Sequence, residues 1–200
     1  MQDPVNWDTS DYGLSLDDTP HVLLVGFTWD IAYGKWNGWT GAKKALLGGW
    51  NLSGILRYEA GRPLRITMAN DMGGLLFNTE KRPNRTGSDG VIAPGDFDPL
   101  TDNYFDRAGW QDPGTLTFGN APRADGTVRG FKVYNEDLTI SKSFNFTNDL
   151  RMRFVASFGN ILNRTTFCAP NQNFSSPAFG TVNTQCNQAR SVQFGLRFDY

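Results

Sequence analysis

The last ten residues of the chain alternate between apolar and polar side chains. Within residues 191–200, every second position is apolar, at Val192, Phe194, Leu196, Phe198 and Tyr200. This period of two predicts a β-strand with one wholly apolar face. Such a face meets either the core of a soluble sheet or, in an outer-membrane barrel, lipid. A strand of about ten residues that ends on an aromatic residue can cross a bilayer at a tilt, which favours lipid.

The same alternation, with some interruptions, predicts five further strands. They lie at residues 21–31, 50–60, 64–68, 133–146 and 150–158. The connections alternate in length, with short turns at 61–63 and 147–149 and long segments at 32–48, 70–127 and 160–189. Outer-membrane barrels have short periplasmic turns and long external loops. We therefore predict an all-β fold, an antiparallel meander of about six transmembrane strands, with the three long loops external and the C-terminus periplasmic.

Aromatic residues near the predicted strand ends fit two membrane interfaces, where barrels concentrate such side chains. With the C-terminus in the periplasm, Trp29 and Trp50 belong to the outer interface. The periplasmic interface takes Tyr58, Phe144, Phe146, Phe198 and Tyr200. Residues 1–20 are polar, and we expect them to form a connecting segment before the barrel section at 21–200.

Charge and composition narrow the possible functions. The net charge is −1, with both signs spread along the chain, so we expect no nucleic-acid partner. The single histidine, His21, argues against multi-histidine metal sites and histidine-based triads. No set of nucleophile, base and oxyanion donor stands out, so we expect neither an enzyme nor a cofactor. Residues 1–4 lack the basic start and apolar core of a secretion signal, so we expect an export signal upstream.

Several short motifs follow one another in a fixed order. They are Leu47-Gly48-Gly49-Trp50-Asn51-Leu52-Ser53-Gly54, Gly61-Arg62-Pro63-Leu64, Arg82-Pro83-Asn84, Phe118-Gly119-Asn120, Phe158-Gly159-Asn160-Ile161-Leu162-Asn163, Phe179-Gly180 and Arg190 before the last strand. From about His21 to Tyr200, the sequence resembles the C-terminal barrel of TonB-dependent receptors of the Oar-like kind, which carry a carboxypeptidase-regulatory domain.

This resemblance implies an outer-membrane transporter with a barrel of about 22 strands and a plugged lumen. A scarce small ligand would bind from outside, and a TonB-type energy-coupling protein would act on the plug. The last strand also resembles the signal that the barrel assembly machinery recognises, although its final residue is Tyr200 instead of the usual Phe. Six strands are fewer than the smallest barrels have, and nothing here resembles a plug. We therefore expect the C-terminal part of a longer protein, or a truncated reading frame.

Several loop residues are candidates for binding or cross-linking. Aromatic side chains that could stack on a ligand at the barrel mouth, or pack within the loops, are Trp36, Trp39, Tyr104, Phe105 and Trp110. Cys168 and Cys186 are expected to form a disulfide, because the cell exterior is oxidising. The spacing of Asp96, Asp98 and Asp102 is loosely that of a calcium loop, but it lacks the glycine and terminal Glu of an EF-hand. We interpret it as a solvated acidic loop, with no metal site.

Charged residues on the polar parity of the strands are expected to face the lumen. They are Arg57, Glu59, Arg65, Arg151, Arg153 and Arg197. They could pair with a plug or form ordinary wall salt bridges. Two other classes of function stay open: a passive porin, and a soluble or surface-attached β-sandwich that binds carbohydrate through Trp36, Trp39 and Trp110.

Overall fold

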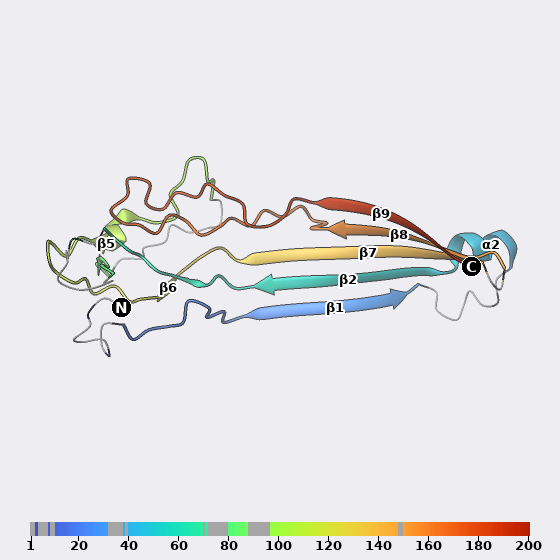
Figure 1. Ribbon diagram of the computed structural model, residues 1–200, viewed down its shortest axis with the longest axis horizontal. Coiled ribbons are helices and arrows are strands. Elements are labelled where there is room, and N and C mark those ends of the chain that lie inside the picture. Colours follow the sequence, from blue (N-terminus) through green and yellow to red (C-terminus); the bar gives the residue numbers. More distant parts are fainter. Residues whose placement is uncertain are drawn as a thin grey trace. The chain divides into compact units, whose positions relative to one another are not determined.

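The computed structural model describes residues 3, 8, 11–31, 38, 40–69, 71, 80–87, 97–147 and 150–200. The chain divides into two compact units, which we describe separately (Figure 1). The sheet unit consists of Val22–Glu59, Val133–Thr165 and Asn187–Tyr200. The loop unit consists of Met1–His21, Ala60–Lys132 and Thr166–Cys186.

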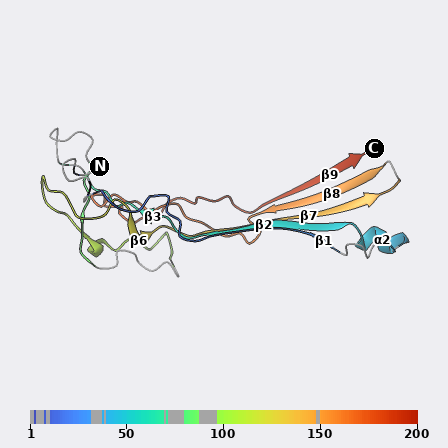
Figure 2. The same ribbon diagram turned by 90° about the horizontal axis from the view of Figure 1, so that it is seen from below.

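The sheet unit is built on one antiparallel sheet of five strands. The strands are β1 (Val22–Asp30), β2 (Trp50–Glu59), β7 (Val133–Asn145), β8 (Arg151–Gly159) and β9 (Ser191–Asp199). They are hydrogen-bonded in the order β1-β2-β7-β8-β9 and form a single layer (Figure 2). Each coincides within a few residues with a strand expected from the alternation of side chains.

The prediction of a further strand at residues 64–68 is wrong. In its place, the two-residue strand β3 (Pro63–Leu64) pairs with β6 (Asp125–Arg129) inside the loop unit. Leu64 and Ile66 alternate with polar neighbours because they are buried in the core of that unit, not because they lie on a sheet face. The chain therefore leaves the sheet after Glu59 and returns at Val133.

Because residues 64–68 are not a strand of the sheet, β1 and β2 run in the direction opposite to the one expected. The connection between β1 and β2 leaves the same end of the sheet as the turn between β7 and β8 and as the C-terminus, and we call this the C-terminal end. Residues 60–132 and 160–190 connect strands at the opposite end, the loop end. The expectation that residues 32–48 share a side with 70–127 and 160–189 is therefore wrong.

The reversed direction of β1 and β2 also moves their aromatic residues to the opposite membrane interface from the one expected. Trp50 lies opposite Lys142 in the register, two residues from Phe144 and therefore at the C-terminal end. Tyr58 lies opposite Tyr134 at the loop end. The tryptophans thus share an interface with Phe144 and Phe198, and Tyr58 belongs to the other one. The helix α2 (Gly41–Leu47) lies in the connection between β1 and β2.

The loop unit has its own hydrophobic core, although its segments were expected to be loops. Small elements in it are β4 (Asn84–Arg85), paired with β5 (Trp110–Gln111), and the 3₁₀-helix η3 (Arg107–Gly109). Its core is formed by Leu64, Ile66, Tyr104, Phe105, Trp110, Val128, Phe179 and Val182. Cys168 and Cys186 form the predicted disulfide, with 4.9 Å between their Cα atoms.

Described residues before His21 form ion pairs within the loop unit. Asp11 forms an ion pair of 2.8 Å with the buried Arg82. Asp18 forms another of 2.7 Å with Arg129. These contacts tie Asp11 and Asp18 to residues from the interior of the chain.

Tyr104 provides a pH-dependent test of this core. Burial raises the pKa of Tyr104 to about 12 from an ordinary value of 10.0, and its hydroxyl donates a hydrogen bond to the Arg129 carbonyl. Between pH 10.0 and about pH 12, the Tyr104 phenol therefore keeps its proton in the folded form and loses it in the unfolded form. The free energy of unfolding falls as the pH rises through this window.

We expect the stability advantage of the wild type over Tyr104→Phe to shrink by roughly 2–3 kcal/mol between pH 9 and pH 12. Urea unfolding of both proteins, followed in parallel at each pH, measures this difference and cancels the titration of all other groups. A difference that is constant with pH would contradict the burial of the phenol.

Candidate membrane-facing surface

The register of the five strands collects apolar side chains on one face of the sheet, which we call the apolar face. From β1 to β9 its members are Leu23, Val25, Phe27, Trp29, Trp50, Leu52, Leu56, Tyr58, Tyr134, Leu138, Ile140, Phe144, Met152, Phe154, Ala156, Phe158, Val192, Phe194, Leu196 and Phe198. On β9 these side chains are 50–67% exposed. Each large apolar side chain left in water forfeits about 1.5–3 kcal/mol. A contiguous exposed surface of this kind marks a membrane or protein contact.

The opposite face, the polar face, carries most of the charged and hydroxyl side chains of the strands. Arg57 pairs with Glu59, and Arg197 pairs with Asp199, each at 2.7 Å. Arg151 and Arg153 lie on this face as well, as predicted from their parity. Arg65 does not, because it belongs to the loop unit, where it forms an ion pair with Glu80.

Two charged residues interrupt the apolar face, and both are 3% exposed. Lys142 lies near the C-terminal end, where its ammonium donates to the Gly48 carbonyl. The same ammonium lies 4.9 Å from the ring centre of Phe144 and 5.5 Å from that of Trp50. The Lys142 side chain thus contacts a backbone carbonyl and two aromatic rings, whose faces attract cations.

The motif Leu47-Gly48-Gly49-Trp50 builds this contact. It ends α2 and begins β2, and the Trp50 indole donates to the Leu46 carbonyl over 2.8 Å. Gly49 has φ +70°, and a Cβ there would lie 2.7 Å from the Ser143 carbonyl oxygen. The Ser143 amide donates to the Gly49 carbonyl over 2.9 Å. Only glycine allows the two backbones to approach this closely.

Glu136 is the second charged residue of the apolar face and lies near the loop end. Its carboxylate accepts a 2.8 Å hydrogen bond from Arg164 Nε. The Arg164 guanidinium lies 5.5 Å from the ring centre of Tyr134, which packs edge-on against Tyr58 at 5.7 Å. This pair was not predicted from the sequence. An acid at an apolar position of the alternation was the signal that could have found it.

The motif Phe158-Gly159-Asn160-Ile161-Leu162-Asn163 positions Arg164. Asn160 and Asn163 have positive φ angles of 48° and 53°, so the chain turns sharply as it leaves β8. The Asn160 side chain accepts from the Arg164 amide over 2.8 Å and donates to the Arg164 carbonyl over 2.8 Å. This bracing holds Arg164 beside the buried carboxylate of Glu136.

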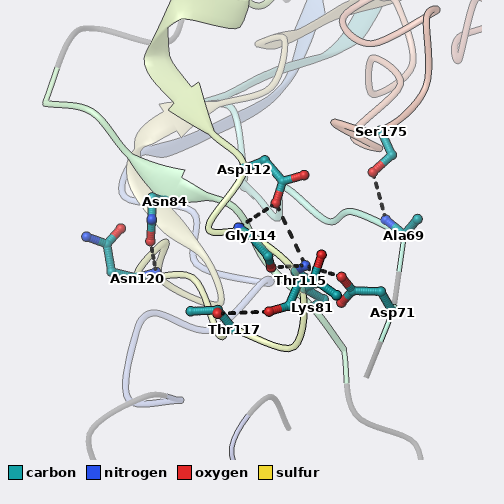
Figure 3. Close-up of polar contacts among 10 residues, drawn as sticks. All are labelled: Ala69, Asp71, Lys81, Asn84, Asp112, Gly114, Thr115, Thr117, Asn120 and Ser175. Atoms are coloured by element: carbon teal, nitrogen blue, oxygen red, sulfur yellow. Dashed lines mark hydrogen bonds and ion pairs between the residues drawn. The ribbon is translucent and has the colours of Figure 1, made fainter. Parts of the chain in front are cut away.

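Two other motifs meet in the loop unit, as Figure 3 shows. The Asn120 amide donates to the Asn84 side chain over 2.9 Å, and the Arg85 amide donates to the Asn120 side chain over 2.7 Å. A Cβ on Gly119 would lie 2.1 Å from the Arg82 carbonyl oxygen, which explains the glycine. The motifs Arg82-Pro83-Asn84 and Phe118-Gly119-Asn120 are therefore two sides of one backbone contact.

Figure 3 also shows the buried Lys81, whose ammonium lies 2.8 Å from the Asp71 carboxylate and 2.7 Å from the Gly114 carbonyl. The hydrogen bond from Lys81 holds the pKa of Asp71 below its ordinary value. This side chain acts as a buried cross-link between loop segments.

The residues expected to stack on a ligand do not form an open site. Tyr104, Phe105 and Trp110 are only 2–4% exposed and pack against one another, with ring centres 5.4–5.5 Å apart in neighbouring pairs. For these three, the ligand-stacking prediction is wrong and the packing alternative holds. Trp36 and Trp39 lie outside the described residues.

The acidic loop likewise offers no arrangement for a cation in its described part. Asp98 accepts a hydrogen bond from the Leu100 amide, and Asp102 accepts one from the Asp98 amide, each over 2.9 Å. Their carboxylates therefore stabilise a turn. Asp96 lies outside the described residues.

A single-layer antiparallel sheet with an exposed apolar face and a polar opposite face is the wall of a membrane β-barrel. A family model described as an outer membrane beta barrel domain matches residues 1–193, so the chain belongs to this family. It is a protein of the bacterial outer membrane, associated with outer-membrane lipid. Searches of curated proteins and of solved structures give no match. Within the described residues, none of the helices has the length and apolar character needed to span a membrane.

The backbone contact at Gly49 can be tested with a matched control. We expect Gly49→Ala to lower the free energy of unfolding by about 2 kcal/mol or more, because the methyl group meets the Ser143 carbonyl and φ is positive. Gly195→Ala, also in the sheet unit, adds a methyl group into open space and should change it by less than about 1 kcal/mol. Urea unfolding of the intact protein in detergent micelles compares them, and equal losses would refute the assigned contact.

Proposed function

We propose that this chain forms the C-terminal part of the barrel wall of a TonB-dependent receptor, which takes up a scarce ligand in an energy-coupled way. The observation that supports a place in a larger barrel is the pair of free sheet edges. Within the described residues, β1 pairs only with β2 and β9 only with β8. In lipid, every unpaired backbone group costs several kcal/mol, and five strands are fewer than the smallest barrels contain.

Further strands of a longer protein are the simplest partners for these two edges. The order of the motifs supports a receptor of the Oar-like kind, and the structure gives them physical roles. Gly49 ends the helix connection, Gly119 closes a loop contact, and Asn160 positions Arg164. A barrel of about 22 strands has a lumen wide enough for a plug. We propose no catalytic role.

The topology supports one orientation. If the C-terminus is periplasmic, residues 60–132 and 160–190 connect strands on the external side, and α2 lies on the periplasmic side. The loop unit then contributes to ligand capture. The exposed apolar residues of β9 then serve as the signal for the barrel assembly machinery. Neither a sandwich nor its proposed carbohydrate site is supported, because Trp110 is buried and the family is one of outer-membrane barrels.

Energy coupling is the property that separates this proposal from a passive porin. We expect cells that carry the gene to deplete at least one solute from minimal medium that gene-deleted cells leave behind, as measured by mass spectrometry. This depletion should disappear in cells that lack TonB and in cells treated with a protonophore. Depletion that persists in both conditions would contradict the proposal and favour a porin.

Orientation can be tested by labelling engineered cysteines on intact cells with a large, membrane-impermeant maleimide. Leu100 of the loop unit is 92% exposed and Leu46 of α2 is 69% exposed, so both positions are accessible. We expect Leu100→Cys to react on intact cells, and Leu46→Cys to react only after the outer membrane is permeabilised. The reverse pattern would invert the proposed orientation.

A further inference from the structure

A cavity of about 750 Å³ lies at the C-terminal end of the sheet unit, where it is lined by the connection that contains α2 and by the ends of β2, β7 and β8. Its wall includes Ser143 and Arg153 of the polar face and Phe144 of the apolar face. Basic side chains on its wall are Lys44, Arg151 and Arg153, and Asp30 is its acidic residue. This volume is in the range of small-molecule sites. The positive charge of the wall is therefore its main chemical character.

The acidic residue of the cavity already has a partner. Asp30 accepts a hydrogen bond of 2.6 Å from the Asn51 side-chain amide. The other arginines of the polar face also have carboxylate partners, because Arg57 pairs with Glu59 and Arg197 with Asp199. In the part of the chain that the structure describes, Arg151 and Arg153 form no such ion pair.

The strand register adds a second, independent feature. Arg153 lies directly opposite Arg197 across the β8–β9 pair. Side chains in such positions have Cβ atoms about 4.5–5.5 Å apart, and like charges there are destabilising. Arg151 is two residues away on the same face, so it adds a third guanidinium to the group. Asp199 lies opposite Arg151 and pairs with Arg197, so these three guanidinium groups have one carboxylate nearby. A bound anion would supply further negative charge and relieve the repulsion between Arg153 and Arg197.

We infer that this cavity binds the carboxylate or phosphate group of an anionic solute. Guanidinium groups recognise both groups through paired N–H donors. Ser141 and Ser143 add hydroxyl groups to the wall. Phe144 and Phe146 also line it, with their rings stacked at 6.4 Å, and they provide an apolar surface for the remainder of the solute.

For its biological use the inference rests on the proposed function, because it names the class of solute that the receptor carries. The cavity lies at the C-terminal end, which is periplasmic in the proposed orientation. The solute would then be held there on its way out of the barrel. Binding itself is measured without transport, so the two proposals can fail separately.

The test is equilibrium binding of phenyl phosphate to the purified intact protein in detergent micelles, followed by isothermal titration calorimetry. Benzyl alcohol serves as the uncharged probe. We expect saturable binding of phenyl phosphate only, with affinity that falls as NaCl is added. Arg153→Gln should weaken it about tenfold or more, because hydrogen bonds to charged groups are among the strong ones.

Arg57→Gln is the matched control, because Arg57 lies on the same polar face but pairs with Glu59 and does not line the cavity. It should leave the affinity within about twofold of the wild type, as expected for a charge outside the contact. Arg153→Gln should unfold at the same or a higher urea concentration than the wild type, since it removes a like-charge contact. Arg151→Gln provides a second variant of the site.

Two results would overturn the inference. One is equal affinity of the wild type and of both cavity variants for phenyl phosphate. The other is the absence of saturable binding of phenyl phosphate to the intact protein. Energy-coupled uptake in that case would leave the proposed receptor function intact.

Discussion

The hydrogen-bonded register of the five-stranded sheet is the constraint on which the rest of the structure depends. A slip of one residue in β9 would turn Phe194, Leu196 and Phe198 to the polar face, at about 1.5–3 kcal/mol for each side chain. Contacts at both ends of the sheet hold the register. At one end Gly49 fits against the backbone of β7, and at the other Asn160 braces the turn that follows β8. The apolar side chains of all five strands are thereby kept on one face of the sheet.

The charges buried on the apolar face are consistent with this arrangement. A charge in a low-dielectric environment is tolerated only when it is paired or hydrogen-bonded. Lys142 meets this condition through a carbonyl and two aromatic rings, and Glu136 meets it through Arg164. Both lie towards the strand ends, where aromatic side chains gather. Residues that hold the strand register therefore lie close in sequence to residues that contact these charges, as Gly49 does to Gly48 and Asn160 to Arg164.

The strands of the sheet could be predicted from sequence because one side of each faces an apolar environment along its length. Periodicity alone could not show that Leu64 and Ile66 enter a core, since a buried loop segment produces the same short alternation. That single error reversed the direction assigned to β1 and β2 and exchanged the interfaces of Tyr58 and Trp50. The disulfide was predictable from cysteine count and compartment.

The core of the loop unit was not predictable, because its aromatic residues lie in segments rich in glycine and proline that have no regular period. For Tyr104, Phe105 and Trp110 the sequence therefore left ligand stacking and packing within the loops open, and the structure shows packing on residues far away in the sequence. Arg164 is 28 residues from Glu136, and only the turn at Asn160 brings the two together. Contacts of this kind depend on backbone conformations that no local pattern specifies.

The loop unit is assembled from three separate segments of the chain, the last of which ends at Cys186. Its disulfide and the contacts of Arg107 with the Phe174 and Ser176 carbonyls need that last segment. During synthesis, therefore, the unit cannot be completed until nearly the whole chain has emerged. Such long-range closure slows folding.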